Sequence, residues 1–114
     1  MKISDIQTLE KIKCLQGKYE DQEIAAGYTS DLLSDVMAHA EEGSVLITIQ
    51  AHKNTIAVAS LLGINAVVVC NNRAVPEEAL LVAEEEGIAI FQTDENQFNT
   101  SFSIARKLSS SSIL

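Results

Sequence analysis

Residues 44–70 read SVLITIQAHKNTIAVASLLGINAVVVC and hold one complete strand–helix–strand unit. Two β-branched runs, at 45–49 and 66–70, flank a helical stretch at 54–62 that ends at Gly63. Both runs are too continuously apolar for strands with one face in water. We therefore expect buried parallel strands joined by a crossover helix, which is an α/β arrangement.

The same unit recurs on either side of this stretch. Further apolar runs at residues 24–26 and 88–91 stand about twenty residues from their neighbours, which suits a βα unit with a three-turn helix. We therefore predict a three-layer α/β fold with a mostly parallel sheet. Glycines or a proline mark most helix ends, and the predicted helices cover residues 31–42, 54–62, 76–86 and 95–108.

Apolar stripes predict which helix faces meet the sheet. The helix at 54–62 instead presents small residues, Ala57, Ala59 and Ser60, which allow close approach to a sheet, another helix or a second copy of the chain. The stripes recur at helical spacing. They consist of Leu32, Leu33, Val36, Met37 and Ala40 in the helix at 31–42, and of Phe98, Phe102 and Ala105 in the helix at 95–108.

Residues 1–22 form a different unit, a helix–strand lead-in. Ser4, with Gln7 three residues later, resembles a capping box that opens a short helix through Glu10. Ile12 and Cys14 alternate with Lys11 and Lys13, which predicts a one-sided edge strand over residues 12–15. A polar, hairpin-like turn over residues 17–22 follows.

We assign residues 1–108 to a single domain and residues 109–114 to a flexible serine-rich tail. The two cysteines, Cys14 and Cys70, each lie in an apolar run, so we expect buried, reduced thiols.

Charge excludes several classes of partner. Sixteen acidic and eight basic side chains give a formal net charge of −8, which repels nucleic-acid phosphates and anionic lipid. The chain also has no apolar run long enough to span a bilayer. We expect a cytoplasmic protein that binds neither nucleic acid nor membrane.

Polar residues gather in four turns, at residues 27–31, 50–54, 71–75 and 92–96, each after a predicted strand. Ligands of open parallel sheets bind beyond the carboxyl ends of the strands, beside helix N-termini. We predict that any ligand site lies here. Its candidate residues are Gly27, Tyr28, Thr29, Ser30, Gln50, His52, Asn54, Arg73 and Thr93.

Several of these residues also have a simpler structural interpretation. Thr29 or Ser30 is expected to cap the following helix, and Asn71 and Asn72 are turn residues. His52 has the position of a ligand contact or a general base, although no nucleophile or carboxylate lies near it in the sequence.

Two further features are expected to be structural. His39 lies four residues after Asp35, which predicts a surface ion pair. The acidic run 84–86 is best explained as a solvated helix end, since consecutive helix positions point in different directions.

No catalytic or cofactor-binding signature is present. The chain lacks the GxGxxG, GxxxxGK[ST], CxxC, HExxH and GxSxG motifs, which removes the usual residues of dinucleotide, P-loop, zinc and serine-hydrolase sites. We therefore expect no cofactor, no metal and no catalytic residues.

Two segments of the sequence resemble a known family. GYTSDLLSDVMAHAEEGSVLITIQAHKNTIAVASLLGINAVVV, at residues 27–69, and AEEEGIAIFQT, at 83–93, are similar to the DRTGG domain, which is related to the N-terminal domain of HPr kinase/phosphorylase. The likeness covers about residues 24–93, and residues 3–22 resemble the lead-in of stand-alone members. The string Asp-Arg-Thr-Gly-Gly itself is missing, and residues 26–29 occupy the comparable turn.

The resemblance implies a three-layer α/β fold, homodimers and a regulatory role. In that family the domain also accompanies phosphotransacetylases and CBS-containing pyrophosphatases, and stand-alone members are associated with iron-only hydrogenase systems and anti-sigma-type regulators. Our leading hypothesis is a non-catalytic, homodimeric regulatory or adaptor domain that modulates a partner enzyme or signalling protein. The alternative is a sensor that binds a nucleotide or another anionic metabolite at the strand ends.

A third hypothesis is an enzyme in its own right. It would need His52 paired with a carboxylate from a neighbouring turn, such as Asp31 or Asp94.

Overall fold

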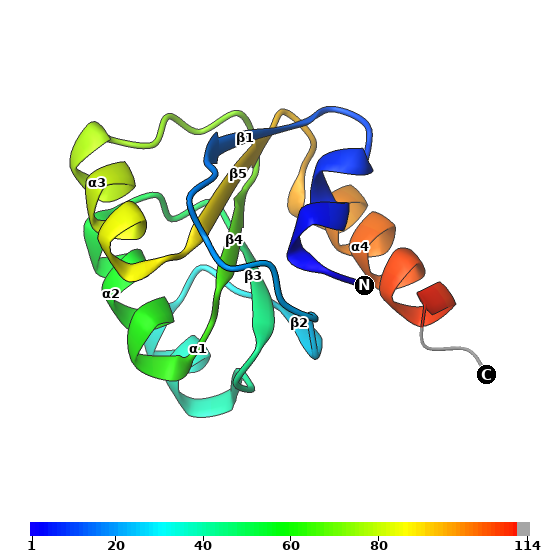
Figure 1. Cartoon of the computed structure of the whole chain (residues 1–114), viewed down its shortest axis with the longest axis horizontal. Helices are drawn as coiled ribbons and strands as arrows, with labels where there is room; N and C mark the ends of the chain where they lie inside the picture. The colour runs from blue at the N-terminus through cyan, green and yellow to red at the C-terminus, as the bar shows by residue number, and fades with distance from the viewer. Residues whose placement is uncertain (112–114) are drawn as a thin grey trace.

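The computed structural model describes residues 1–111 and contains one five-stranded sheet with helices on both faces (Figure 1). None of its described helices is both long and apolar enough to cross a bilayer. In chain order the elements are η1 (Ile3–Thr8, a 3-10 helix), β1 (Ile12–Gln16), β2 (Ala26–Thr29), α1 (Leu33–His39), β3 (Ser44–Thr48), α2 (Lys53–Leu62), β4 (Ala66–Val69), α3 (Glu77–Glu86), β5 (Ala89–Thr93) and α4 (Gln97–Ser111).

The sheet has the order β1-β5-β4-β3-β2, so two strands that follow each other in sequence, β1 and β2, lie at opposite edges. Strands β2 to β5 are parallel, and β1 runs antiparallel to β5, with Ile12 opposite Thr93. The prediction of a mostly parallel sheet from βα units is confirmed. The segment at 17–22 is not part of a hairpin, because β1 pairs with β5 rather than with β2.

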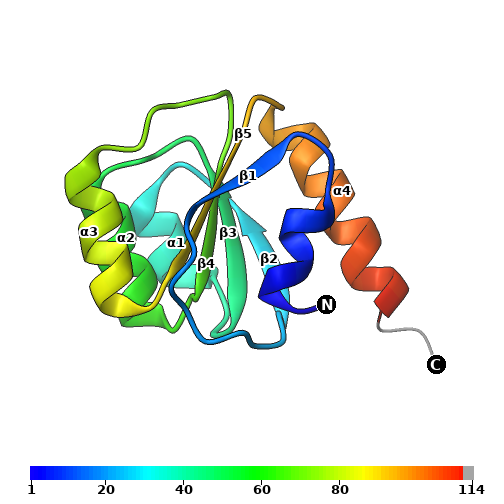
Figure 2. The same cartoon turned by 45° about the horizontal axis from the view of Figure 1, so that its top comes forward.

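Helices α1, α2 and α3 cover one face of the sheet, and η1 and α4 cover the other (Figures 1 and 2). Each central strand therefore buries both of its faces. In β3, Leu46 packs toward α1–α3, whereas the next residue, Ile47, packs toward η1 and α4. This double burial explains why the central strands are continuously apolar.

Helix α2 lies against both the sheet and α3. The small residue Ala59 is fully buried, and Ser60 donates a hydrogen bond to Glu86 at the end of α3. Ala57 is exposed. The small residues of this helix therefore serve core packing and contact with the neighbouring helix.

The first parallel strand begins later than predicted. Residues 24–26 were expected to form it, but β2 covers Ala26–Thr29. The amide of Ile24 instead donates to the carbonyl of Met1, 2.8 Å away. Gly27, Tyr28 and Thr29 are consequently strand residues and not turn residues.

Helix α1 is shorter than predicted and packs by one face only. It begins after Leu32 and ends at His39, and among its own residues only Val36 is fully buried. Leu32 and Met37, expected on the buried stripe, are exposed. The helix connects the edge strand β2 to β3 and packs against α2.

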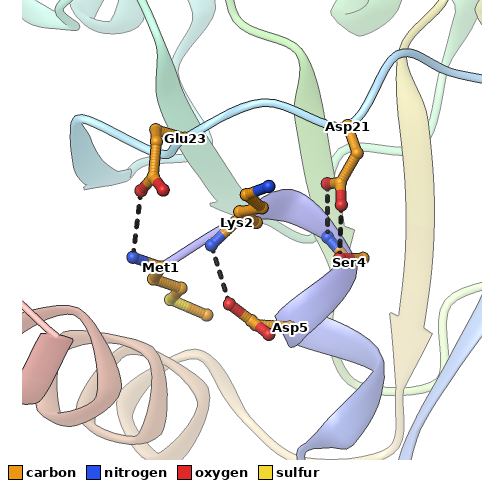
Figure 3. Close-up of polar contacts among 6 residues, drawn as sticks. All are labelled: Met1, Lys2, Ser4, Asp5, Asp21 and Glu23. Atoms are coloured by element: carbon orange, nitrogen blue, oxygen red, sulfur yellow. Dashed lines mark hydrogen bonds and ion pairs between the residues drawn. The ribbon is translucent and has the colours of Figure 1, made fainter.

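The lead-in is held by contacts that differ from the predicted capping box. The residue before the helix is Lys2 and not Ser4, and the Lys2 amide donates to Asp5 Oδ2 at 2.8 Å. Ser4 donates through its amide and its hydroxyl to Asp21, at 3.0 and 2.6 Å (Figure 3). These bonds lower the pKa of Asp21 and fasten η1 to the segment that leads to β2.

Helix α4 corrects two predictions. It continues through residues 109–111, which were assigned to a flexible tail; the rest of that tail lies outside the described residues. Phe98 and Phe102, expected on the buried face, are 80% and 60% exposed. The face toward the sheet carries Thr100 and Ile104 instead. A helix that buries a threonine and exposes phenylalanines reverses the usual pattern. The position of the phenylalanines therefore predicted the wrong face of α4 as the buried one.

Candidate functional site

The four parallel strands end at the same edge of the sheet, so the loops after β2, β3, β4 and β5 are neighbours there. Most sequence-predicted site residues lie in or near these loops. Their side chains do not converge on one cavity. The edge is divided between a central hydrogen-bonded carboxylate and separate pockets on either side.

Asp31 is the centre of this edge. Its Oδ1 atom accepts hydrogen bonds from Thr48 Oγ1, the Ile49 amide and Gln97 Nε2, each 2.9 Å long. These donors belong to the end of β3 and the start of α4. Asp31 therefore ties three elements together, a role that the sequence did not indicate.

The loop after β4 is fixed to the end of β5. Asn71 and Asn72 adopt left-handed backbone angles, φ 60° and 52°, which asparagine tolerates better than most residues. Their amides donate to the carbonyls of Glu95 and Thr93 at 2.9 and 2.8 Å. Gln92 Nε2 also donates to the carbonyl of Arg73 at 2.7 Å. The two asparagines act as turn residues, as expected.

The first pocket lies where α2 and α3 begin. It has a volume of about 460 Å³ and is lined by His52, Lys53, Asn54 and Glu78, among others. Lys53 Nζ and Glu78 Oε1, 2.6 Å apart, connect the two helices, and Glu78 raises the pKa of Lys53. Helix N-termini favour anions. This pocket therefore combines a histidine, a lysine, an amide and two helix starts, with one opposing carboxylate.

A second pocket, of about 410 Å³, lies between the turn before β1 and the start of α4. Lys11, at a left-handed φ of 64°, pairs with Glu95 at 3.1 Å, and Asn99 donates to the same carboxylate at 3.1 Å. Both contacts lower the pKa of Glu95, with Lys11 the larger cause. Thr100, 3% exposed, lines the pocket as well.

The Thr100 hydroxyl has no hydrogen-bond partner within residues 1–111. Burial raises the pKa of the Cys70 thiol. Both cysteines are free; Cys70 is buried as expected, whereas Cys14 is only partly buried.

A third pocket, of about 390 Å³, shares Lys11 and Thr93 with the second and adds Lys13 and Asn72. Neither Lys11 nor Lys13 was predicted as a site residue. They lie here because β1 runs antiparallel to β5, which places the start of β1 beside the end of β5. The alternation at residues 11–14 predicted an edge strand but did not identify its partner.

The remaining predicted residues lie apart from the His52 pocket. The hydroxyl of Tyr28 donates to Asp35 at 2.8 Å, which raises the pKa of Tyr28, and Asp35 also pairs with His39 at 3.2 Å as predicted. Ser30 accepts a hydrogen bond from the Leu32 amide at 3.2 Å. The other positions are Gly27 and Thr29 within β2, Gln50 in the loop after β3 and Arg73 exposed after β4.

His52 has no carboxylate partner among the residues that the structure describes. Asp31 is held by Thr48, Ile49 and Gln97, and Asp94 lines the third pocket beside Lys11. The acid–base pair required by the enzyme hypothesis is therefore not assembled in this arrangement.

Comparison with known proteins gives a likeness in fold. No family model matches the chain, and no curated protein matches it in sequence. A solved structure of the CBS and DRTGG domains from the regulatory region of Clostridium perfringens pyrophosphatase, complexed with the activator diadenosine tetraphosphate, superposes with a TM-score of 0.69. The identity is 13% over 88% of this chain, which spans 44% of that one. At this identity the likeness shows the fold alone, and it agrees with the DRTGG resemblance at that level.

Proposed function

We propose that this chain is a non-catalytic, homodimeric regulatory domain of the DRTGG type that modulates a partner enzyme or signalling protein. The observation that carries the proposal is the shared fold, which in the pyrophosphatase belongs to a regulatory region. The kinds of partner follow from the family resemblance: an enzyme, or an anti-sigma or hydrogenase-associated protein.

The use of the polar groups at the strand ends supports a regulatory role over a catalytic one. The Asp31 carboxylate, the Gln92 amide and the Thr93 carbonyl all hold loops in place. Only the Asp31 carboxylate among these groups can take up a proton, and its three hydrogen bonds come from β3, the residue after it and α4, not from His52.

A nucleotide or another anionic metabolite is our second candidate, as the signal that the domain senses. It is favoured by the activator in the pyrophosphatase complex and by the His52 pocket, where two helix N-termini and Lys53 lie together. Asn54 would supply hydrogen bonds, and the Lys53–Glu78 pair would open so that Lys53 can meet a phosphate.

Thermal unfolding with diadenosine tetraphosphate, ATP and inorganic phosphate tests this candidate. A ligand at a hundred times its dissociation constant adds about 2.7 kcal/mol to the free energy of unfolding. We expect stabilisation by at least one nucleotide, reduced at least tenfold in apparent affinity by His52→Ala with Asn54→Ala. His39→Ala, which removes the other histidine, is the matched control. If none of these compounds raises the unfolding temperature, the sensor hypothesis is wrong and the adaptor hypothesis remains.

Two measurements test the regulatory role itself. The nucleotides are followed by phosphorus NMR during prolonged incubation, and they should remain intact; their hydrolysis would contradict a non-catalytic domain. Proteins captured by crosslinking in the source cells are then purified and assayed with and without this chain. We expect the activity of one of them to change at least twofold.

A further inference from the structure

The strongest unexplained feature of the surface is the phenylalanine stripe of α4. Phe98 and Phe102 are two of the three phenylalanines in the chain, and both are mostly exposed. Ala105 and Ser109 continue the stripe at helical spacing and are exposed too. Large exposed aromatic side chains that lie side by side mark an interaction surface in soluble domains. We name these four residues the α4 stripe.

The α4 stripe lies beside an open edge of the sheet. Strand β2 pairs with β3 alone, so its outer backbone groups have no strand partner among the described residues. Thr29 Oγ1 contacts Ser101 Oγ at 2.7 Å, and Ala25 lines a surface hollow together with Ala105 and Ser109. These contacts place the side of α4 that carries the stripe next to this edge, and Figure 2 shows α4 and β2 on the same side of the sheet centre.

The β2 edge is a short strand of four residues and has only this one of the usual protections against strand pairing. Natural edge strands carry charges, prolines or bulges that prevent edge-to-edge association. Residues 25–30, AAGYTS, contain none of these residue types, and the β2–β3 register is regular. In a chain with a net charge of −8, an uncharged edge is the surface on which a second copy meets least repulsion.

A two-fold axis perpendicular to the sheet would join two such edges as antiparallel strands. Both α4 helices would then lie on the same face. Since α4 packs over β2 and β3, and neighbouring strands are about 4.8 Å apart, the two helix axes would be about 10 Å apart. That spacing is close to the 8–10 Å of ordinary helix packing.

The α4 stripe is complementary to itself in this arrangement. Its large residues, Phe98 and Phe102, lie in the first half of the helix, and its small residues, Ala105 and Ser109, lie in the second. Antiparallel helices would place each phenylalanine against a small residue of the copy.

We propose that two copies of this chain associate through the β2 edge and the α4 stripe, and form one continuous sheet. The proposal rests on the homodimer of the proposed function and names its surface. A different partner would have no reason to match the large-to-small order of the stripe. Each contact occurs twice across the axis, as expected for an isologous interface.

Sedimentation equilibrium of the full chain, at concentrations from 0.1 to about 100 times a micromolar dissociation constant, tests this surface. We expect a dimer in the wild type and an at least hundredfold weaker association in Phe98→Glu with Phe102→Glu. Leu61→Glu is the matched control. Leu61 is 73% exposed on α2, on the opposite face of the sheet, so this variant should dimerise as the wild type does.

The outcomes separate this surface from the proposed function. A strictly monomeric wild type would overturn both this proposal and the homodimer. A dimer that tolerates both glutamates would overturn only the surface, and nucleotide stabilisation is scored independently. Circular dichroism establishes that the glutamate variant is folded; if it is not, Phe98→Ser with Phe102→Ser takes its place. Hydrogen exchange adds a local readout, since the β2 amides should lose protection in the monomeric variant.

Discussion

At the scale of single residues, the most consequential side chain at the strand ends is Asp31. It accepts three hydrogen bonds through one oxygen atom, from a hydroxyl, a backbone amide and a side-chain amide. Two of the donors follow or end β3, and the third belongs to the first turn of α4. Their common acceptor makes the geometry of this edge depend on one carboxylate.

We predict that Asp31→Ala lowers the free energy of unfolding by about 2–4 kcal/mol, because hydrogen bonds to charged groups contribute about 1.5–3 kcal/mol each and are not additive. Asp31→Asn keeps an acceptor oxygen and should lose less. Urea denaturation measures both variants. Asp94→Ala, at an exposed aspartate just after the end of β5, is the control. Equal stabilities of the Asp31→Ala and Asp94→Ala variants would contradict the role of Asp31.

The sequence identified the region of the candidate site better than its residues. His52 and Asn54 lie in one pocket because both precede or begin α2. Tyr28 and Thr29 were misplaced because Ile24, predicted to begin the strand, pairs with Met1 instead, and β2 begins only at Ala26. Lys11 and Lys13 were missed because their position depends on a strand pairing 81 residues apart in the sequence, such as that of Ile12 with Thr93.

At the scale of elements, the glycines that end α2 and α3 offer a matched pair. Gly63 and Gly87 are both left-handed, with φ of 74° and 68°. A Cβ at Gly63 would approach Glu42 Cγ to 2.8 Å, whereas a Cβ at Gly87 would meet nothing within 4 Å. Replacing either glycine by alanine therefore forces a left-handed backbone on a residue with a Cβ, but only the substitution at Gly63 adds a steric clash.

We predict that Gly87→Ala lowers the free energy of unfolding by about 1–2 kcal/mol, the cost of a left-handed non-glycine residue. Gly63→Ala should lose about 1 kcal/mol more, because Glu42 or the helix end must move. Thermal and urea unfolding of the two variants give the comparison. If Gly63→Ala is the more stable of the two, Glu42 rotates away without cost and the steric argument is wrong.

Sequence patterns predicted the central elements closely and the edge elements poorly. Strands β3, β4 and β5 are apolar on both faces, so their sequences indicate buried strands whichever helices cover each face. Helices α2 and α3 end at glycines that the sequence displays. The orientation of α4 could not be predicted, because its buried face uses Thr100 and Ile104 while two phenylalanines remain outside.

At the scale of the whole molecule, stability should decrease from the centre of the sheet toward its edges. Strands β3 and β4 are buried along their entire length and have neighbours on both sides, whereas β1 and β2 have one neighbour each. Local opening is easiest where contacts are fewest. The strand order could not be predicted from sequence, since nothing local indicates that β1 lies beside β5.

We predict that amides of β3 and β4 exchange with solvent deuterium at least tenfold more slowly than those of β1 and β2. The glutamate variant of the α4 stripe is the suitable sample, because a monomer leaves the β2 edge open. Exchange followed by mass spectrometry or NMR measures the ratio. Amides of β1 as slow as those of β4 would show that the antiparallel edge unfolds only together with the sheet.

The pairing of β1 with β5 has a consequence for biosynthesis. Residues 12–16 are synthesised long before Thr93, the last residue of their partner strand β5. During translation β1 has no strand to pair with until β5 is made. Meanwhile Ser4 of η1 can already bond to Asp21, and the βα units that follow can assemble in turn. Closure of this edge is therefore a late event that spans most of the chain, and such distant contacts slow folding.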